Sequence, residues 1–271
     1  VALVGSIAAK LAEWGRQVRF WVVTFAAIPL TIRKYHHEIG RILSEIAFGT
    51  GAIVVGGSTI GVVVLLSAMT GAGVGLSGYV GLNAIGLAPL SGFISAYGNT
   101  RELAPLVGAI AFAAHVGSRF TAQLGSMRIS EEIDAIEVMA IRSLPYMVTT
   151  RVLAALIAVV PMYLVALFSS YGATQVMITG LFHQSSGTYQ HYFRLLISPS
   201  DVIYSVVKIM IFCVAVTMIH CYHGYNAKGG PEGVGRATGT AIRTSIIVVT
   251  VLDMVLSLLF WGSNPGISIT G

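Results

Sequence analysis

A group of charged residues interrupts an otherwise apolar sequence within residues 127–141, MRISEEIDAIEVMAI. Charged residues make up only 10% of the chain, yet five lie within ten positions here: Arg128, Glu131, Glu132, Asp134 and Glu137. They include four of the eleven acidic residues of the protein. Carboxylates in such a short segment could bind a basic partner, or they could lie exposed on a membrane surface.

Helical spacing distinguishes between these two uses. We predict that Ser130 caps the N-terminus of a helix, which puts Glu131 and Glu132 in the first turn, where carboxylates interact favourably with the helix dipole. The opposite face is apolar, because apolar residues recur at helical spacing: Ile129, Ile133, Ile136 and Ala140. Helices that lie on the anionic inner leaflet are usually basic. The pattern therefore favours a docking helix over a surface-bound one.

Two lone charges, Lys208 and Asp253, occur in separate long apolar runs. At 1.5 Å per residue, Lys208 lies about 9 Å from the start of its run, and Asp253 lies about 12 Å from the end of the next run. In consecutive spans, these two ends are on the same side of the membrane. Antiparallel neighbours would bring them to comparable depth. We predict a buried ion pair, with substrate contact as the alternative.

A second group of polar residues belongs to a third apolar run. Arg101 and Glu102 open this run, and an ionisable pair at membrane depth indicates a functional site, with interfacial anchoring as the alternative. His115 lies further inside the run, where a polar side chain is expected to face the interior of a helix bundle. A hydrogen-bonded core histidine is favoured there over a proton relay.

Other motifs point away from nucleotide and metal chemistry. GPEGVGRAT, residues 230–238, has two glycines at the spacing of a phosphate-binding loop, but Arg236 and Ala237 stand where that motif needs Lys and Ser or Thr. We predict a flexible loop there. His220 and His223 have no carboxylate nearby, which favours interfacial anchoring over a metal site. Cys221 and Cys213 fit neither a metal spacing nor a disulfide framework.

The elements that position these residues are membrane helices. The chain has 271 residues, 55% of them hydrophobic, and a mean hydropathy of +0.81. A soluble domain would carry about a quarter charged residues to form its surface, which this chain cannot supply. Its 31 glycines suit close helix contacts in a membrane. We therefore predict an all-α polytopic membrane protein.

Five apolar runs are long enough to cross a bilayer, which takes roughly 20 residues. They are residues 46–68, 103–120, 152–173, 202–221 and 245–261, with a kink expected at Pro161. Residues 17–39 are broken by Pro29 and predict an amphipathic or elbow helix in the interface. Residues 74–95, rich in Gly and Pro, predict an irregular or re-entrant segment. The chain is thus a single domain, with an interfacial region over 1–45 and a five-span region over 46–271.

Basic residues predict the orientation. With the N-terminus in the cytoplasm, thirteen of the sixteen basic residues fall on the cytoplasmic side, which leaves only Arg101, Arg194 and Lys208. This predicts a multi-pass protein of the inner membrane. The formal charge of +5 then follows from topology and does not indicate nucleic-acid binding.

Residues 101–141, RELAPLVGAIAFAAHVGSRFTAQLGSMRISEEIDAIEVMAI, resemble the signature of the MlaE/YrbE permeases, the membrane subunits of MCE-associated lipid ABC transporters. Residues 224–242, GYNAKGGPEGVGRATGTAI, resemble the last cytoplasmic loop of that family, and Lys208 and Asp253 match family positions. The resemblance covers the chain from about residue 46 and looks like an actinobacterial YrbE of an Mce system. Gln123 departs from the family where many relatives have an acid, and Thr150 departs where many have a proline.

The resemblance implies a five-span permease subunit, not an enzyme, that works as a dimer and moves a lipid: a fatty or mycolic acid, a sterol or a phospholipid, with import the usual direction. The acidic helix would be the coupling helix, seated in a separate ATPase dimer that binds ATP and Mg, so this chain needs no cofactor or metal. Arg101, Glu102 and His115 would line a lipid cavity, in which Arg101 would contact an anionic headgroup. MCE proteins would bind on the outer side. Gln123 favours a heterodimer with a second YrbE-type subunit over a homodimer.

Two other functions remain open from the sequence. One is a membrane-embedded lipid-modifying enzyme, with His115, Asp253 or Glu102 in acid–base roles. The other is a structural subunit that holds its partners together without touching substrate. The first requires activity from the isolated chain, and the second requires that cavity residues have no effect on transport.

Overall fold

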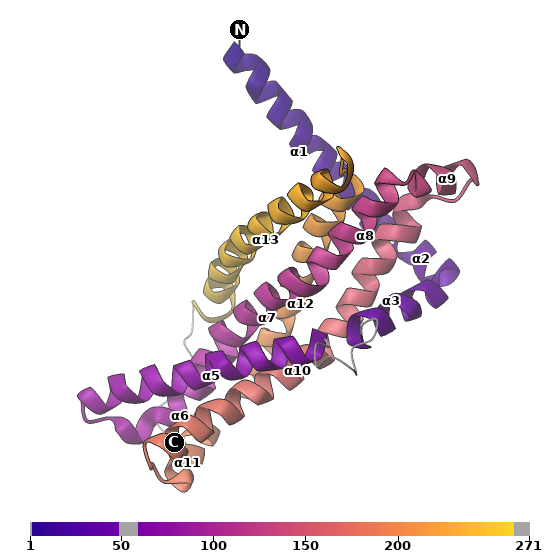
Figure 1. The fold of residues 1–271 in the computed structure, drawn as a ribbon. Helices are drawn as coiled ribbons and strands as arrows, with labels where there is room; N and C mark the ends of the chain where they lie inside the picture. The colour runs from indigo at the N-terminus through magenta and orange to yellow at the C-terminus, as the bar shows by residue number, and fades with distance from the viewer. Residues whose placement is uncertain (1, 49–58, 263–271) are drawn as a thin grey trace.

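A computed structural model describes residues 2–48 and 59–262, and every regular element in these ranges is a helix (Figure 1). Five helices in the described ranges are long and apolar enough to cross a membrane: Thr59–Ala84, Ala88–Ile129, Leu144–Leu181, Pro199–Tyr225 and Gly230–Trp261. The predicted all-α architecture with five spans is therefore confirmed. The boundaries of several spans differ from the prediction.

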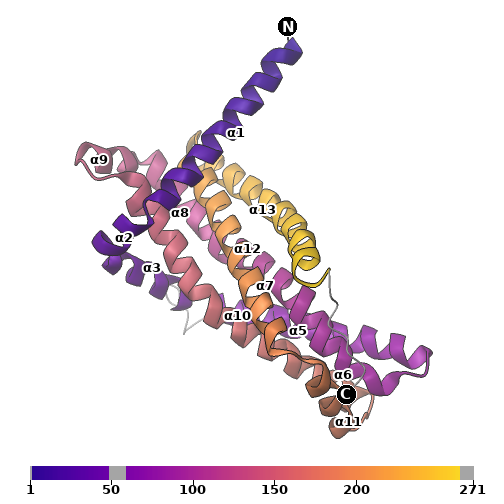
Figure 2. The ribbon, with the colours of Figure 1, turned by 180° about the vertical axis from the view of Figure 1, so that it is seen from behind.

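The N-terminal region forms three helices where one interfacial elbow was predicted. They are α1 (Ala2–Ala26), α2 (Ile28–Lys34) and α3 (His36–Phe48), with α1 projecting away from the bundle (Figures 1 and 2). Pro29 lies in the first turn of α2, and the boundary between α1 and α2 at Ala27 comes two residues before it, as the missing N–H of a proline favours. A second boundary lies at Tyr35, between α2 and α3.

The first span is α5 (Thr59–Ala84), later in the sequence than predicted. Residues 46–48 belong to α3, and residues 49–58 lie outside the described part of the chain. The prediction of an irregular segment over residues 74–95 is wrong for its first half, because α5 continues without a break to Ala84. Only then follow a turn and two short helices, η1 (Ala88–Leu90) and α6 (Ser91–Ile94).

Glycines support α5 because they face a neighbouring helix. A Cβ atom at Gly71 would overlap the backbone carbonyl of Ser170, and one at Gly75 would lie 3.1 Å from the carbonyl oxygen of Thr174. Thr174 also donates a hydrogen bond from Oγ1 to the carbonyl of Gly71, at 2.7 Å. Small residues at these positions let two membrane helices approach closely. The sequence pattern that suggested a break is therefore a packing surface.

The second span is a continuous helical run that includes two π-helical stretches. After α6 it comprises η2 (Ser95–Leu103), α7 (Ala104–Phe112), η3 (Ala113–Gly117) and α8 (Ser118–Ile129). The π-helical turns of η2 come directly before Pro105, which has no N–H to donate into the preceding turn. Because the run begins well before residue 101, Arg101 and Glu102 lie inside it and do not open it, contrary to the prediction.

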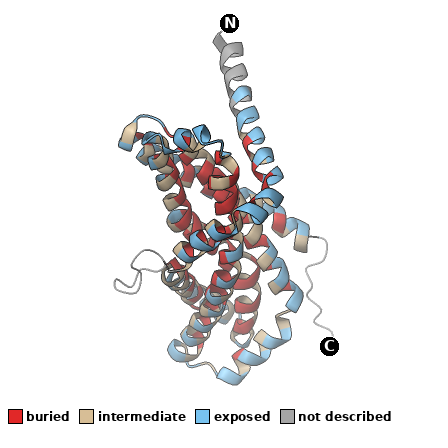
Figure 3. Ribbon diagram, turned by 90° about the vertical axis from the view of Figure 1, so that its right-hand side faces the viewer, coloured by how far each residue is buried: buried red, intermediate tan, exposed pale blue. Residues whose placement is uncertain are grey.

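The third span combines η4 (Leu144–Thr149), α10 (Thr150–Val176) and η5 (Met177–Leu181), and Pro161 lies within α10. A short helix, α11 (Ser186–Leu196), precedes α12 (Pro199–Tyr225) and α13 (Gly230–Trp261). Buried residues concentrate on α10, α12 and the second span, whereas the described side chains of α1 are largely exposed (Figure 3). The helices α6 and α11 lie at one end of the bundle, and α9 (Glu132–Val138) lies at the other (Figure 1).

The predicted flexible loop over residues 230–238 is wrong, because these residues form the first turns of α13. Only residues 226–229 connect α12 to α13. Gly229 and Gly230 take positive φ angles of 89° and 69°, which glycine adopts at little cost, and Pro231 then starts the helix. Glu232 and Arg236 form an ion pair one turn apart, at 3.5 Å.

The packing of α5 on α10 predicts opposite effects for two neighbouring glycines. Gly71→Ala should lower the free energy of unfolding by about 1–3 kcal/mol, because the added methyl group has no space against Ser170. Gly73→Ala is the matched control: nothing lies within 4 Å of its Cβ position, so the change should be neutral or stabilise the helix by up to about 1 kcal/mol. The measurement is thermal unfolding in detergent, followed by a dye that reacts with the buried thiols Cys213 and Cys221. Equal melting temperatures for the two variants would contradict the assignment of this contact.

Candidate functional site

A buried lysine organises the polar residues inside the membrane bundle. The side chain of Lys208, on α12, is fully buried, and its Nζ lies 2.7 Å from Asp253 Oδ1 on α13. The predicted pairing of these two residues is therefore present. The same Nζ lies 3.1 Å from Glu102 Oε2 and donates to Ser257 Oγ and to the carbonyl of Arg101, both at 2.8 Å. Glu102, which the sequence placed in a separate site, thus belongs to the lysine's own surroundings.

A second ion pair lies beside the first. Arg101 contacts Asp201 Oδ2 through Nη2 at 3.0 Å, and both side chains are buried. The guanidinium of Arg101 lies 3.7 Å from the ring centre of Tyr97, a cation–π contact. The indole of Trp261 donates to the other oxygen of Asp201 at 2.7 Å. Arg101 is therefore held inside the protein by these contacts. Its guanidinium is not placed for the expected direct contact with a lipid headgroup.

Sequence reasoning missed Asp201, Ser257 and Trp261. A signal for two of them was available, because Asp253, Ser257 and Trp261 recur four residues apart and so share one face of α13. Asp201 had no such signal: it is an ordinary acidic residue in the first turn of α12, where it suits the helix dipole. Its pairing depends on how η2 lies against α12.

The five charged residues form what we call the charge layer, a band of ion pairs across η2, α12 and α13: Arg101, Glu102, Asp201, Lys208 and Asp253. Two cations face three carboxylates. The side chain of Glu102 is 45% exposed, against 14% for Asp253 and 8% for Asp201, so Glu102 is the member that reaches the surface of the chain. This arrangement fixes three helices relative to one another and presents a single carboxylate outward.

His115 lies apart from the charge layer. It belongs to η3, about 20 Å further along the same helical run at 1.5 Å per residue. Its Nε2 is buried and has no hydrogen-bond partner among the described residues. The structure therefore does not bring His115 together with Asp253 and Glu102, as an acid–base enzyme built on those three would need. Within the described ranges, no group of three metal-ligating side chains occurs.

The acidic segment forms the short helix α9, but it begins differently from the prediction. Ser130 ends α8 instead of capping α9, and its hydroxyl donates to Glu132 Oε1 at 2.8 Å. The next residue, Glu131, has a left-handed backbone with φ of 60°, and Ala140 after the helix has φ of 59°. Such conformations are uncommon for residues other than glycine and cluster at functional sites. Two sharp backbone turns therefore set α9 off from its neighbours.

Side-chain contacts fix α9 on the body of the protein. Ile133 is fully buried, and Ile136 packs on the core, so half of the predicted apolar face is used. The other two predicted members, Ile129 and Ala140, are exposed and lie outside α9. Asp134 pairs with Arg128 at 2.6 Å, and Glu137 accepts hydrogen bonds from Tyr225 and Ser143. Those two acids thus hold the helix in place. The surface that remains exposed combines Glu131 and Glu132 with two apolar side chains, Val138 and Met139.

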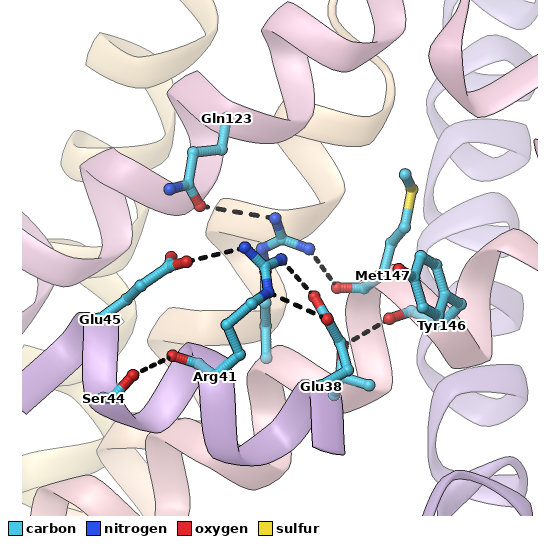
Figure 4. Close-up of polar contacts among 9 residues, drawn as sticks. Glu38, Arg41, Ser44, Glu45, Gln123, Tyr146 and Met147 are labelled. Carbon is cyan, nitrogen blue, oxygen red and sulfur yellow. Dashed lines mark hydrogen bonds and ion pairs between the residues drawn. The ribbon is translucent and has the colours of Figure 1, made fainter. Parts of the chain in front are cut away.

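Gln123, the departure noted in the sequence, lies beside Arg151 at the junction of α3, α8 and α10 (Figure 4). Arg151 is buried and donates to the carbonyl of Met147 at 2.6 Å and to Gln123 Oε1 at 3.5 Å. The acids of α3, Glu38 and Glu45, are both engaged by Arg41, and the bond to Glu38 raises the pKa of the Arg41 guanidinium. No carboxylate among the described side chains lies within 4 Å of Arg151.

Long apolar helices around a buried band of ion pairs, with an exposed helix at one end, are the architecture of a multi-pass integral membrane protein. The family profile described as permease MlaE matches residues 48–259. The chain therefore belongs to the MlaE permease family. Its expected role as a transporter subunit, and not an enzyme, is confirmed, because the similar proteins are described as permeases of ABC transporters.

Three relatives illustrate the range of the family. A probable ABC transporter permease protein of Rickettsia bellii is 29% identical over 90% of this chain and 91% of its own length. The intermembrane phospholipid transport system permease protein MlaE of Haemophilus influenzae is 30% identical over 74% of this chain and 78% of its own. The chloroplastic protein TRIGALACTOSYLDIACYLGLYCEROL 1 of Arabidopsis thaliana is 27% identical over 76% of this chain and 59% of its own.

The charge layer predicts a graded series of stabilities. Lys208→Met should be the most harmful single change, with a loss of about 3–5 kcal/mol, because it leaves Glu102 and Asp253 without their shared cation. Asp253→Asn should cost less, since Lys208 keeps Glu102. The double variant Lys208→Met/Asp253→Asn should recover part of the loss, and thermal unfolding of all three in detergent tests the order. A double variant no more stable than Lys208→Met alone would contradict the pairing.

The junction of α3, α8 and α10 predicts a stabilising substitution. Gln123→Glu should raise the free energy of unfolding by about 1 kcal/mol, because it gives the buried guanidinium of Arg151 a carboxylate partner. The control is the same change in an Arg151→Met background, where the gain should disappear. Thermal unfolding in detergent is again the measurement. A gain of equal size in both backgrounds would show that the added charge acts elsewhere.

Proposed function

We propose that this chain is the permease subunit of an ATP-driven, MCE-associated lipid transporter, with α9 as its coupling helix. The observation that carries the proposal is the construction of α9. The buried side chain of Ile133 and the polar contacts of Asp134 and Glu137 attach it to the body of the protein, so the helix is expected to move with the bundle. Its free surface joins two carboxylates to two apolar side chains, which suits a groove with basic rims on a partner protein.

The partner in this proposal is a cytoplasmic ATPase dimer that binds ATP and Mg. The segment with the glycine spacing of a phosphate-binding loop, residues 230–238, is not built to hold nucleotide, because it is helical and carries Arg236 and Ala237 at the key positions. Energy for transport must then enter through a contact, and α9 is the element built for one. The helix α9 is connected to α8 along the chain and to α12 through the hydrogen bond between Glu137 and Tyr225. A movement of α9 would therefore be transmitted along these helices to the charge layer.

The proposed orientation puts the N-terminus and α9 in the cytoplasm. The end of the bundle that carries α9 also carries the turn between α12 and α13 (Figure 1), and basic residues in or next to these connections lie there: Arg128, Arg142, Lys228 and Arg236. Positive charge near the ends of membrane helices marks the cytoplasmic side. MCE proteins would then bind at the opposite end, near α6 and α11.

The proposed lipid path runs beside the charge layer, between two permease subunits. Glu102 would face it directly, while Arg101 would shape it through Asp201, and His115 would contribute further along the same helical run. The Haemophilus relative is named for phospholipid transport. We propose that this chain transports a lipid of that class, or a fatty acid, a mycolic acid or a sterol. The proposed direction is import. Gln123 supports a second, non-identical YrbE-type subunit as the partner in the dimer.

Reversing the charges on the free surface of α9 tests the proposal. Glu131→Lys/Glu132→Lys should reduce co-purification of the ATPase at least about tenfold, because like charges would then meet across the contact. Glu137 is left unchanged, since it holds α9 in place. Glu232→Lys is the matched control: it reverses an exposed acid in the first turn of α13 and should have no effect.

The measurement is mass spectrometry of chains and lipids that co-purify in mild detergent from native membranes. An ATPase and MCE proteins should accompany the wild type, and only the ATPase should be lost from the reversed variant. Wild-type protein without an ATPase would overturn the coupling role. A complex that assembles normally but holds no lipid would favour the purely structural subunit.

A further inference from the structure

A groove of about 700 Å³ lies between the N-terminal helices and the connection from α9 to η4. One wall is formed by Val22, Val23 and Leu30 of α1 and α2, and the other by Ile141, Leu144 and Pro145. Val22 and Leu30 are 60% and 41% exposed, so their apolar surfaces are uncovered in this chain. We call this the N-terminal groove. It does not share a residue with the charge layer.

Two hydrogen bonds place the groove at the membrane boundary. Thr31 donates from Oγ1 to the carbonyl of Pro145 at 3.3 Å, and Thr149 donates to the carbonyl of Thr24 at 3.2 Å. Both bonds reach η4, the first turns of the third membrane-spanning helix. The groove therefore opens at the level where that helix enters the bilayer, which is where lipid headgroups meet acyl chains.

The charges around the groove favour an anion. Arg142 lines it and is exposed. The one carboxylate in the lining, Glu137, is already bound by Tyr225 and Ser143. The adjoining helices add four exposed basic residues: Arg16, Arg19, Arg33 and Lys34. An exposed arginine beside apolar walls, with further basic residues on the adjoining helices, matches a lipid with a phosphate headgroup.

The exposed surface of α1 supports the same conclusion. Large apolar side chains recur along it at helical spacing and are uncovered: Trp14, Val18, Val22 and Phe25. Arg16 and Arg19 lie between them in the sequence, so α1 combines an apolar stripe with positive charge. Helices of this kind lie in the headgroup region and bind anionic lipids. Val22 belongs to both the stripe and the groove, so the two surfaces are continuous.

We propose that the N-terminal groove binds an anionic phospholipid as a resident ligand that is not transported. An acyl chain lies between α1 and η4, and the phosphate contacts Arg142. In the orientation proposed above, the lipid comes from the cytoplasmic leaflet. Only this choice of leaflet depends on that proposed orientation. Because Ala140 and Ile141 line the groove, the bound lipid also contacts the left-handed turn at Ala140 that ends α9. Anionic lipid would therefore steady the position of the docking helix.

A photoreactive lipid tests the site directly. The native assembly is reconstituted in phosphatidylcholine nanodiscs that contain phosphatidylglycerol with a diazirine in one acyl chain, and cross-linked peptides are identified. Adducts are expected on residues 22–30 and 140–145. Unlabelled phosphatidylglycerol should compete, and extra phosphatidylcholine should not. Equal competition by both lipids would overturn the proposal, because the groove would then bind acyl chains without regard to charge.

Four variants separate lipid binding in the groove from lipid binding elsewhere on the chain. Arg142→Gln should lower cross-linking about tenfold through loss of a charge-assisted contact, whereas Arg243→Gln, an exposed arginine on α13 away from the groove, should leave it unchanged. Ala26→Trp should also abolish cross-linking by filling the groove at an exposed position.

Adducts that survive both groove variants but disappear with Glu102→Gln would assign the lipid to the transport path. Protection of residues 22–30 by the ATPase instead of lipid would identify the groove as a protein contact. Either result refutes the proposal.

Discussion

The burial of Lys208 is the constraint on which the rest of the bundle depends. An ammonium group among apolar helices loses its hydration, and only close oxygens can compensate for that loss. The oxygens around Nζ come from η2 and α13, so any movement that separates these helices would expose an uncompensated charge to hydrocarbon. Asp201, which receives both Arg101 and the indole of Trp261, ties the last turn of α13 to the first turn of α12. Because Glu102 is the member of the charge layer that reaches the surface, a change at that carboxylate would be transmitted through Lys208 to three helices.

The opposite end of the molecule depends on different interactions. There α9 is anchored by one buried isoleucine, an ion pair and two hydroxyl contacts, and it is bounded by left-handed residues at both ends. The N-terminal helices approach the same region through Thr31 and Thr24. The docking helix and the N-terminal groove thus lie next to each other, while close packing at Gly71 and Gly75 keeps α5 fixed on α10.

Composition and periodicity were sufficient to establish the class of the protein. A chain with so few charges can only be stable among lipids, and the lengths of its apolar runs set the number of spans at five. The periodicity of residues 127–141 also predicted the inward positions of Ile133 and Ile136. The depths of Lys208 and Asp253 predicted their pairing, given that consecutive spans are antiparallel neighbours. These predictions follow from helix geometry.

Most properties that depend on neighbours required the folded structure. Gly75 looked like a helix breaker but proved to be a contact point, because only α10 reveals what lies against it. Arg101 looked available for a headgroup until Asp201, a hundred positions away, was found beside it. Ser130 looked like a cap for the following helix, yet it ends the preceding one. In each case the residue types were informative, but the energy of a buried charge or a close contact depends on its partner, and chain folding alone supplies that partner.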